Sequence, residues 1–207
     1  MRTLAVDCAT EACSVALFEY DELIAGDHRL LGRGHAEHLV PMIAALPDKG
    51  RADRIALSLG PGSFTGVRIG LAAARALALA WHAEIFGYPT LALVAAIARL
   101  RFGPQPVSVA MPGGHGEWFV QDFAGDGLPE DDLHSLPPAD AEKRARHDLI
   151  AGTQAEALVA QRGKGQAVPL WPDARHFLAL PPALLSSTIA PLYGRAPDAR
   201  LPGEPAR

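Results

Sequence analysis

The sequence predicts an α/β fold divided into two lobes, of which the second is reduced. Segments of strand length and of helix length follow one another over the first hundred residues in the order β-β-β-α-β-α-β-α. Three strands in a meander followed by crossovers give a mixed sheet. Only four of the 18 prolines precede Arg101, so the second half differs in composition. We therefore predict an N-terminal lobe at residues 1–102 and a reduced C-terminal lobe at residues 103–207.

The individual elements follow from local patterns of apolar residues, caps and turns. Thr90 is a good cap for the third helix, and Thr153 for a helix that ends near Gln161. In the first lobe we expect strands at residues 3–7, 14–18, 23–29, 54–59 and 85–88, and helices at 35–46, 64–82 and 90–101. In the second we expect strands at 104–110, 118–123 and 147–151, a loop at 125–138, a short amphipathic helix at 171–180 and an extended C-terminus.

A glycine-rich turn joins the fourth predicted strand directly to the long second helix. Glycine turns at a helix N-terminus can bind phosphate, but they also let a helix pack closely against a sheet. The glycine spacing matches neither the dinucleotide fingerprint nor the P-loop, and no lysine follows. The residues alone therefore favour close packing. The structural turn comprises Gly60, Pro61, Gly62, the N-cap Ser63 and Gly66.

Composition limits the classes of protein to which the chain could belong. Hydrophobic residues make up 49% of the 207 residues and charged residues 20%, as in globular proteins. A net charge of −4 argues against a protein that binds nucleic acid alone, since phosphate contacts need lysine and arginine. Cys8 and Cys13 give no disulfide framework and read as buried apolar residues. No signal peptide precedes the first strand, so we expect a cytoplasmic protein without a membrane anchor.

Residues that could carry chemistry are few. His35 and His38 could share a helix face, but no carboxylate or cysteine cluster completes a metal site. The sequence around Ser63 is not the G-x-S-x-G of a nucleophile elbow. His115 and Glu117 could form an acid–base pair, although a solvated Gly113–Gly116 loop is the simpler interpretation. We therefore predict no catalytic residue and no metal.

The strongest functional feature is a predicted protein-binding surface on two helices. Arg68, Arg75 and His82 recur every seven residues on the long helix, so they share one stripe with apolar neighbours. Two such helices side by side can form half of a four-helix interface, although an ordinary surface is the alternative. The predicted interface comprises His35, His38, Leu39, Met42, Arg68, Leu71, Ala72, Arg75 and Leu79.

Three segments of the sequence resemble the TsaB (YeaZ) family of bacterial proteins. They are the signature SLGPGSFTGVRIG at residues 58–70, the N-terminus MRTLAVDCATEACSVAL and HAEHLVPMI at residues 35–43. The resemblance is strong over about residues 1–100 and then fades, with echoes at residues 116–117 and 191–195. Pro112, Gly113 and Gly114 stand where the family usually has Asp-Ala-Arg, so any role of those residues in the family is in doubt here.

The resemblance implies a two-lobed fold like that of actin, Hsp70 and sugar kinases, which is ribonuclease-H-like. It also implies a non-catalytic subunit for threonylcarbamoyladenosine synthesis in tRNA, which pairs with the transferase TsaD through the two helices and activates it. Further implied partners are the ATPase TsaE in a ternary complex and, functionally, TsaC. The chain would form a homodimer when alone and would meet tRNA only through the complex.

The same resemblance raises the question of a nucleotide cofactor. In the actin-like fold a D-x-G-T turn holds nucleotide phosphate, and here Asp7 and Thr10 flank Ala9 in place of the glycine. We expect no cofactor, or weak ATP or ADP binding at Asp7 and Thr10. TsaD carries an H-x-x-x-H pair, which is lost here because residue 39 is leucine. The alternative function is an actin-fold phosphotransferase or ATPase that uses Asp7 and the glycine turn.

Overall fold

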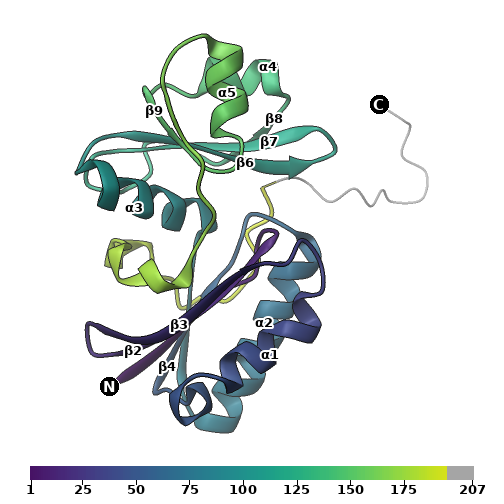
Figure 1. The fold of residues 1–207 in the computed structure, drawn as a ribbon, viewed down its shortest axis with the longest axis vertical. Coiled ribbons are helices and arrows are strands. Elements are labelled where there is room, and N and C mark those ends of the chain that lie inside the picture. The colour runs from purple at the N-terminus through teal and green to yellow at the C-terminus, as the bar shows by residue number, and fades with distance from the viewer. Residues whose placement is uncertain (195–207) are drawn as a thin grey trace.

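The computed structural model describes residues 1–194 as two five-stranded sheets joined by helices (Figure 1). The predicted extended C-terminus lies largely outside the described residues. The first sheet has the order β3-β2-β1-β4-β5, with antiparallel β1, β2 and β3 and parallel β1, β4 and β5. Its strands are β1 (Arg2–Asp7), β2 (Ala12–Glu19), β3 (Glu22–Leu30), β4 (Arg54–Ser58) and β5 (Glu84–Tyr88).

The second sheet repeats the topology of the first, which the sequence does not reveal as a repeat. Its order is β10-β9-β6-β7-β8, with an antiparallel meander of β6, β7 and β8 and parallel β6, β9 and β10. Each strand therefore has a counterpart five strands earlier in the chain. The strands are β6 (Val107–Gly114), β7 (Glu117–Phe123), β8 (His134–Leu136), β9 (Leu149–Ala151) and β10 (Gln166–Val168).

Helices cover the outer face of each sheet and fill the space between the two sheets. Helices α1 and α2 lie on the first sheet, α4 and α5 lie on the second, and α3 and the 3-10 helix η2 lie between them (Figure 1). The bounds are α1 (His35–Ala44), α2 (Phe64–Trp81), α3 (Thr90–Phe102), α4 (Pro138–Arg144), α5 (Ala155–Arg162), η1 (Pro47–Gly50), η2 (Ala174–Ala179) and η3 (Pro182–Leu184).

The largest hydrophobic core is shared by both lobes. It combines residues of both sheets with residues 91–98 of α3, which are buried on all sides because this part of the helix lies between two apolar layers. Phe177 of η2 is at its centre, with ring centroids 6.1 Å from Phe18, 5.9 Å from Phe86 and 5.7 Å from Tyr88. Aromatic contacts of this geometry add to the hydrophobic stabilisation.

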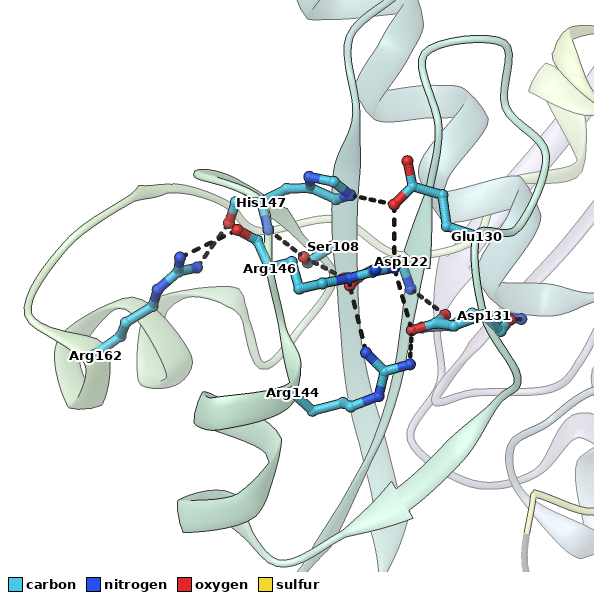
Figure 2. Close-up of polar contacts among 9 residues, drawn as sticks. Ser108, Asp122, Glu130, Asp131, Arg144, Arg146, His147 and Arg162 are labelled. Atoms are coloured by element: carbon cyan, nitrogen blue, oxygen red, sulfur yellow. Dashed lines mark hydrogen bonds and ion pairs between the residues drawn. The ribbon is translucent and has the colours of Figure 1, made fainter.

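A charged network fastens the segment after α4 to the second sheet (Figure 2). Asp122 of β7 is fully buried, and its Oδ1 accepts a hydrogen bond from the Ser108 hydroxyl at 2.5 Å. Its Oδ2 accepts a hydrogen bond from Nε of Arg146 at 2.7 Å. The ring of His147 turns away to Glu130, 3.0 Å from Nε2, and only the backbone N–H of His147 reaches the Ser108 oxygen. Ser108, Asp122 and His147 therefore do not form a hydrolase triad.

Most predicted elements of the first lobe are present, whereas the second half differs in several places. The expected loop at 125–138 contains β8, and α4 and β10 have no counterpart in the prediction. The expected helix at 171–180 is the shorter 3-10 helix η2. Thr90 and Thr153 do not cap their helices, because the N-cap residues are Pro89 and Gln154. The division at residue 102 stays a prediction.

Candidate functional site: an interlobe cavity and a two-helix surface

A cavity of about 730 Å³ lies between the lobes where the β1–β2 turn, the start of α2 and the β6–β7 hairpin meet. Most of its wall is apolar, and Leu192, Tyr193 and Gly194 near the end of the described residues also line it. Pockets of this size and character are the usual form of a ligand site. The side chains that bring polar atoms to its wall are Thr10, Glu11, Ser63, Arg68, His115 and Tyr193.

The turn that would hold phosphate in this cavity is closed by the glycine-rich turn. The backbone N–H of Ser63 donates a hydrogen bond to the carbonyl oxygen of Ala9 at 2.6 Å. A Cβ atom on Gly62 would lie 1.9 Å from the same oxygen, so the two turns are in direct backbone contact. Because the N–H of Ser63 is already bonded to Ala9, it is not available to an anionic phosphate chain there.

The predicted nucleotide-binding pair is separated by the structure. Thr10 lines the cavity, where its Oγ1 accepts a hydrogen bond from the N–H of Ala12 at 3.1 Å. Asp7 is fully buried and is not part of the cavity wall, which corrects its expected place beside a ligand. Its Oδ1 accepts a hydrogen bond from the N–H of Ala9 at 2.9 Å, whereas Oδ2 has no hydrogen-bond partner among residues 1–194.

Burial changes the acid–base behaviour of Asp7. The loss of hydration raises the pKa of the Asp7 carboxyl to about 7, against the opposing effect of the Ala9 N–H and the nearby hydroxyls of Ser58 and Tyr88. The negative charge of Asp173 raises the pKa further. A carboxyl that is half neutral near pH 7 and sealed from the cavity is poorly suited to hold a nucleotide-bound metal ion.

The glycines of the signature allow α2 to lie directly on the β1–β2 turn. A Cβ atom on Gly66 would lie 2.0 Å from the carbonyl oxygen of Cys8, whereas one on Gly70 would lie 3.6 Å from the Cys8 Cβ. We expect Gly66→Ala to lower the free energy of unfolding by about 2 kcal/mol, because the helix must move off the sheet. Urea unfolding measures the effect.

Gly70→Ala is the matched control on the same helix. Its added methyl group meets only ordinary van der Waals contact, so the higher helix propensity of alanine should stabilise the protein by up to about 1 kcal/mol. Equal destabilisation by the two variants would contradict the close-approach explanation.

The structure divides the predicted protein-binding surface into buried and exposed residues. His35, Leu39, Met42 and Leu71 are buried in the core of the first lobe, so they position the two helices and are not surface residues, contrary to the prediction. The Nε2 atom of His35 lies 3.3 Å from the carbonyl oxygen of Ala12. The exposed members of the predicted surface are His38, Arg68, Ala72, Arg75 and Leu79.

Apart from Arg68 and Arg75, the exposed residues in the middle and at the end of α2 are apolar. Only 33% of this helix is buried, although it is the one helix within residues 1–194 with the length and composition to cross a membrane. Leu79 is 79% exposed, and exposed alanines precede and follow it. We call the residues Ala72, Ala76, Leu79 and Ala80 the α2 crest.

The two arginines of the predicted interface hold the chain's own C-terminal segment. Arg75 donates a hydrogen bond from Nη2 to the carbonyl oxygen of Ile189 at 2.7 Å, and Arg68 donates one to the hydroxyl of Tyr193 at 3.1 Å. The segment also pairs with the first sheet, since the N–H of Leu192 donates to the carbonyl oxygen of Leu59 at 2.7 Å. We call residues 186–194 the C-terminal strap. No sequence pattern marks the strap, because these partners lie more than a hundred residues away.

The other candidate catalytic groups have structural partners. The Ser63 hydroxyl oxygen accepts a hydrogen bond from the N–H of Gly66 at 3.2 Å, as the predicted N-cap should. The carboxylate of Glu117 accepts a hydrogen bond from the Ser135 hydroxyl at 2.6 Å, while His115 lines the cavity. Within residues 1–194 no three histidine, cysteine or acidic side chains are grouped so that they could hold a metal ion.

Comparison with known proteins confirms the predicted fold class. The model of a family described as TsaD, tRNA N6-adenosine threonylcarbamoyltransferase, matches residues 29–132, half of the chain. The structure of YeaZ from Pseudomonas aeruginosa superposes with a TM-score of 0.77 at 28% identity, over 93% of this chain and 99% of that one. The ethanolamine utilization protein EutJ from Carboxydothermus hydrogenoformans has a TM-score of 0.51 at 12% identity, over 87% of this chain and 89% of that one, and shows the fold alone.

A curated relative supports the same assignment at the level of sequence. The tRNA threonylcarbamoyladenosine biosynthesis protein TsaB of Escherichia coli is 37% identical over 131 residues, which are 61% of this chain and 56% of that protein. The chain thus spans about half the length of this relative. The chain belongs to the family that the threonylcarbamoyltransferase model describes and, within it, to the TsaB (YeaZ) proteins.

Proposed function

We propose that this protein acts in tRNA threonylcarbamoyladenosine biosynthesis as a non-catalytic subunit that binds and activates the TsaD transferase. The α2 crest is the observation that carries the proposal. An exposed row of alanine and leucine on the longest helix does not stabilise the lobe itself, whereas a partner helix can pack closely against such a row. Membership in the TsaB proteins supports the role, since a relative is named for this biosynthesis.

The environment of the crest suits contact with a second protein. On one side Ile69, Ala73 and Leu77 of α2 pack in the same apolar cluster as the buried residues of α1. On the other side Arg68 and Arg75 hold the C-terminal strap. Both flanks are thus fixed by internal contacts, so the crest is presented rigidly and loses little entropy on binding. By the same argument, a second copy of the chain would occupy the crest when no transferase is present.

A reconstituted threonylcarbamoylation assay with TsaC, TsaD, TsaE and unmodified tRNA tests the proposal. We expect Ala72→Glu to reduce modification at least about ten-fold, because a buried unpaired charge opposes association by several kcal/mol. Ala72 is exposed, so the variant should fold, whereas a charge at the buried Leu71 would disrupt the lobe itself.

Ala157→Glu is the matched control, because Ala157 is exposed on α5, the topological counterpart of α2 in the second lobe. It should leave modification unchanged. Full activity of Ala72→Glu, or modification without this chain, would overturn the proposal. Loss of activity on Asp7→Asn with a folded protein would favour the alternative of an ATP-binding enzyme.

A further inference from the structure

The interlobe cavity plays no part in binding through the α2 crest, yet its wall has a distinct chemical character. Its wall is formed largely by apolar side chains, among them Pro61, Phe64, Val67, Met111 and Phe119. Removing a flat hydrocarbon ring from water into such a space is favourable in proportion to the apolar area buried. The volume of about 730 Å³ exceeds that of a bicyclic ring system, so such a ring can lie between the lobes.

Arg68 places a fixed positive charge in this apolar wall. Its guanidinium carbon lies 3.3 Å from the centroid of the Phe64 ring, and Nη2 donates to the Tyr193 hydroxyl at 3.1 Å. These two contacts set the orientation of the guanidinium plane before any ligand arrives. No carboxylate within residues 1–194 forms an ion pair with Arg68, and further N–H donors of the group stay available. A preorganised arginine of this kind favours a planar carboxylate.

Two other features limit how much negative charge the cavity accepts. The N–H of Ser63 donates to the carbonyl oxygen of Ala9, so the glycine-rich turn does not offer this donor to a phosphate chain. The carboxylate of Glu11 also lines the cavity, where it accepts a hydrogen bond from Nε1 of Trp171 at 2.8 Å. A ligand with several negative charges would therefore be repelled by Glu11.

We propose that the interlobe cavity binds a small aromatic molecule that carries a single carboxylate. The ring lies between the lobes against the apolar wall, and the carboxylate accepts hydrogen bonds from the guanidinium of Arg68. This site is separate from the α2 crest, although both use residues of the same helix. A ligand there would contact Tyr193 of the C-terminal strap as well as the start of α2.

Naphthylacetate and its neutral amide, naphthylacetamide, test the proposal as a pair of equal shape. Calorimetry on the full chain should show one saturable site that prefers the carboxylate by about ten-fold, since a charge-assisted hydrogen bond is lost in the amide. In Arg68→Gln the two probes should bind with equal affinity. Arg75→Gln is the matched control, because Arg75 also holds the strap but does not line the cavity, and it should keep the preference.

Several results would overturn this proposal. One is the absence of saturable binding, and another is a preference for the carboxylate that is unchanged in Arg68→Gln. An equal loss of that preference in Arg75→Gln would attribute binding to the strap. Competition by ATP for the same site, with higher affinity than naphthylacetate, would assign the cavity to a nucleotide instead. The measurement needs neither TsaD nor tRNA, so its outcome is independent of the proposed function.

Discussion

Asp7→Asn is expected to raise the free energy of unfolding by up to about 4 kcal/mol at about pH 8 and by much less at about pH 5. The cause is the burial of Asp7, which raises the pKa of its carboxyl from 3.8 to about 7 in the folded protein. In the unfolded chain the same carboxyl is hydrated and ionises near its ordinary pKa.

The direction of the pH effect follows from the protons bound in each state. Between about pH 4 and about pH 7 the folded protein holds a proton on Asp7 that the unfolded chain releases, so stability falls as pH rises. Below this range both states are protonated, and above it the folded protein carries a charge in an apolar environment. Asparagine has the shape of the neutral acid and does not ionise, so its advantage grows with pH.

Urea unfolding of the two proteins at both pH values measures the effect. The difference between variant and parent should increase by roughly 2–3 kcal/mol from about pH 5 to about pH 8. Comparison at each pH cancels the groups that the substitution does not affect. Asp173 stays ionised over this range, because against the effect of its burial the hydrogen bonds from Arg175 lower its pKa. A difference that is constant with pH would show that burial does not raise the pKa of Asp7.

Asp122→Ala is expected to lower the free energy of unfolding by about 3 kcal/mol. The variant removes the acceptor of the buried Ser108 hydroxyl and the hydrogen-bonding partner of Arg146 (Figure 2). The hydroxyl then loses its partner in a site without access to water, which costs more than the hydrogen bond itself contributed. The segment that leads into β9 should loosen, because Arg146 and His147 anchor it there.

Urea unfolding checks this prediction, and Asp140→Ala provides the matched control. Asp140 pairs with Lys143 on α4 at 3.1 Å, with both side chains largely exposed. Exposed pairs of this kind contribute at most about 1 kcal/mol, so the control should change stability little. If the two variants were equally stable, the buried network would contribute no more to the free energy of unfolding than the exposed pair does.

The first lobe could be predicted from sequence because its elements are long and its turns have strong signals. The signature at residues 58–70 predicts strand, turn and helix correctly, and Ser63 caps α2 as expected. Cys8 and Cys13 are buried free thiols, again as expected. The strand β9 was predicted within residues 147–151, but β8 and β10 have only three residues each, which is too short for an alternating pattern to appear. The repeated sheet topology was missed for the same reason.

The candidate site could be predicted only in part, because helix periodicity shows which residues share a face but not what covers that face. Leu39 and Leu71 lie on the apolar sides of their helices, and those sides pack on the sheet. Arg68 and Arg75 share a stripe as predicted, but the stripe meets Ile189 and Tyr193 of the strap. Contacts between segments so far apart in the chain leave no local signal.

The shared core between the sheets makes folding a property of the whole chain. Helix α3 follows the first sheet in sequence, yet its apolar residues are covered by residues of the second sheet and by η2, which comes after β10. Residues 1–102 expressed alone would expose α3 and the face of β1 and β2 that Phe177 covers. Unfolding should therefore be a single cooperative transition, with neither sheet surviving the loss of the other.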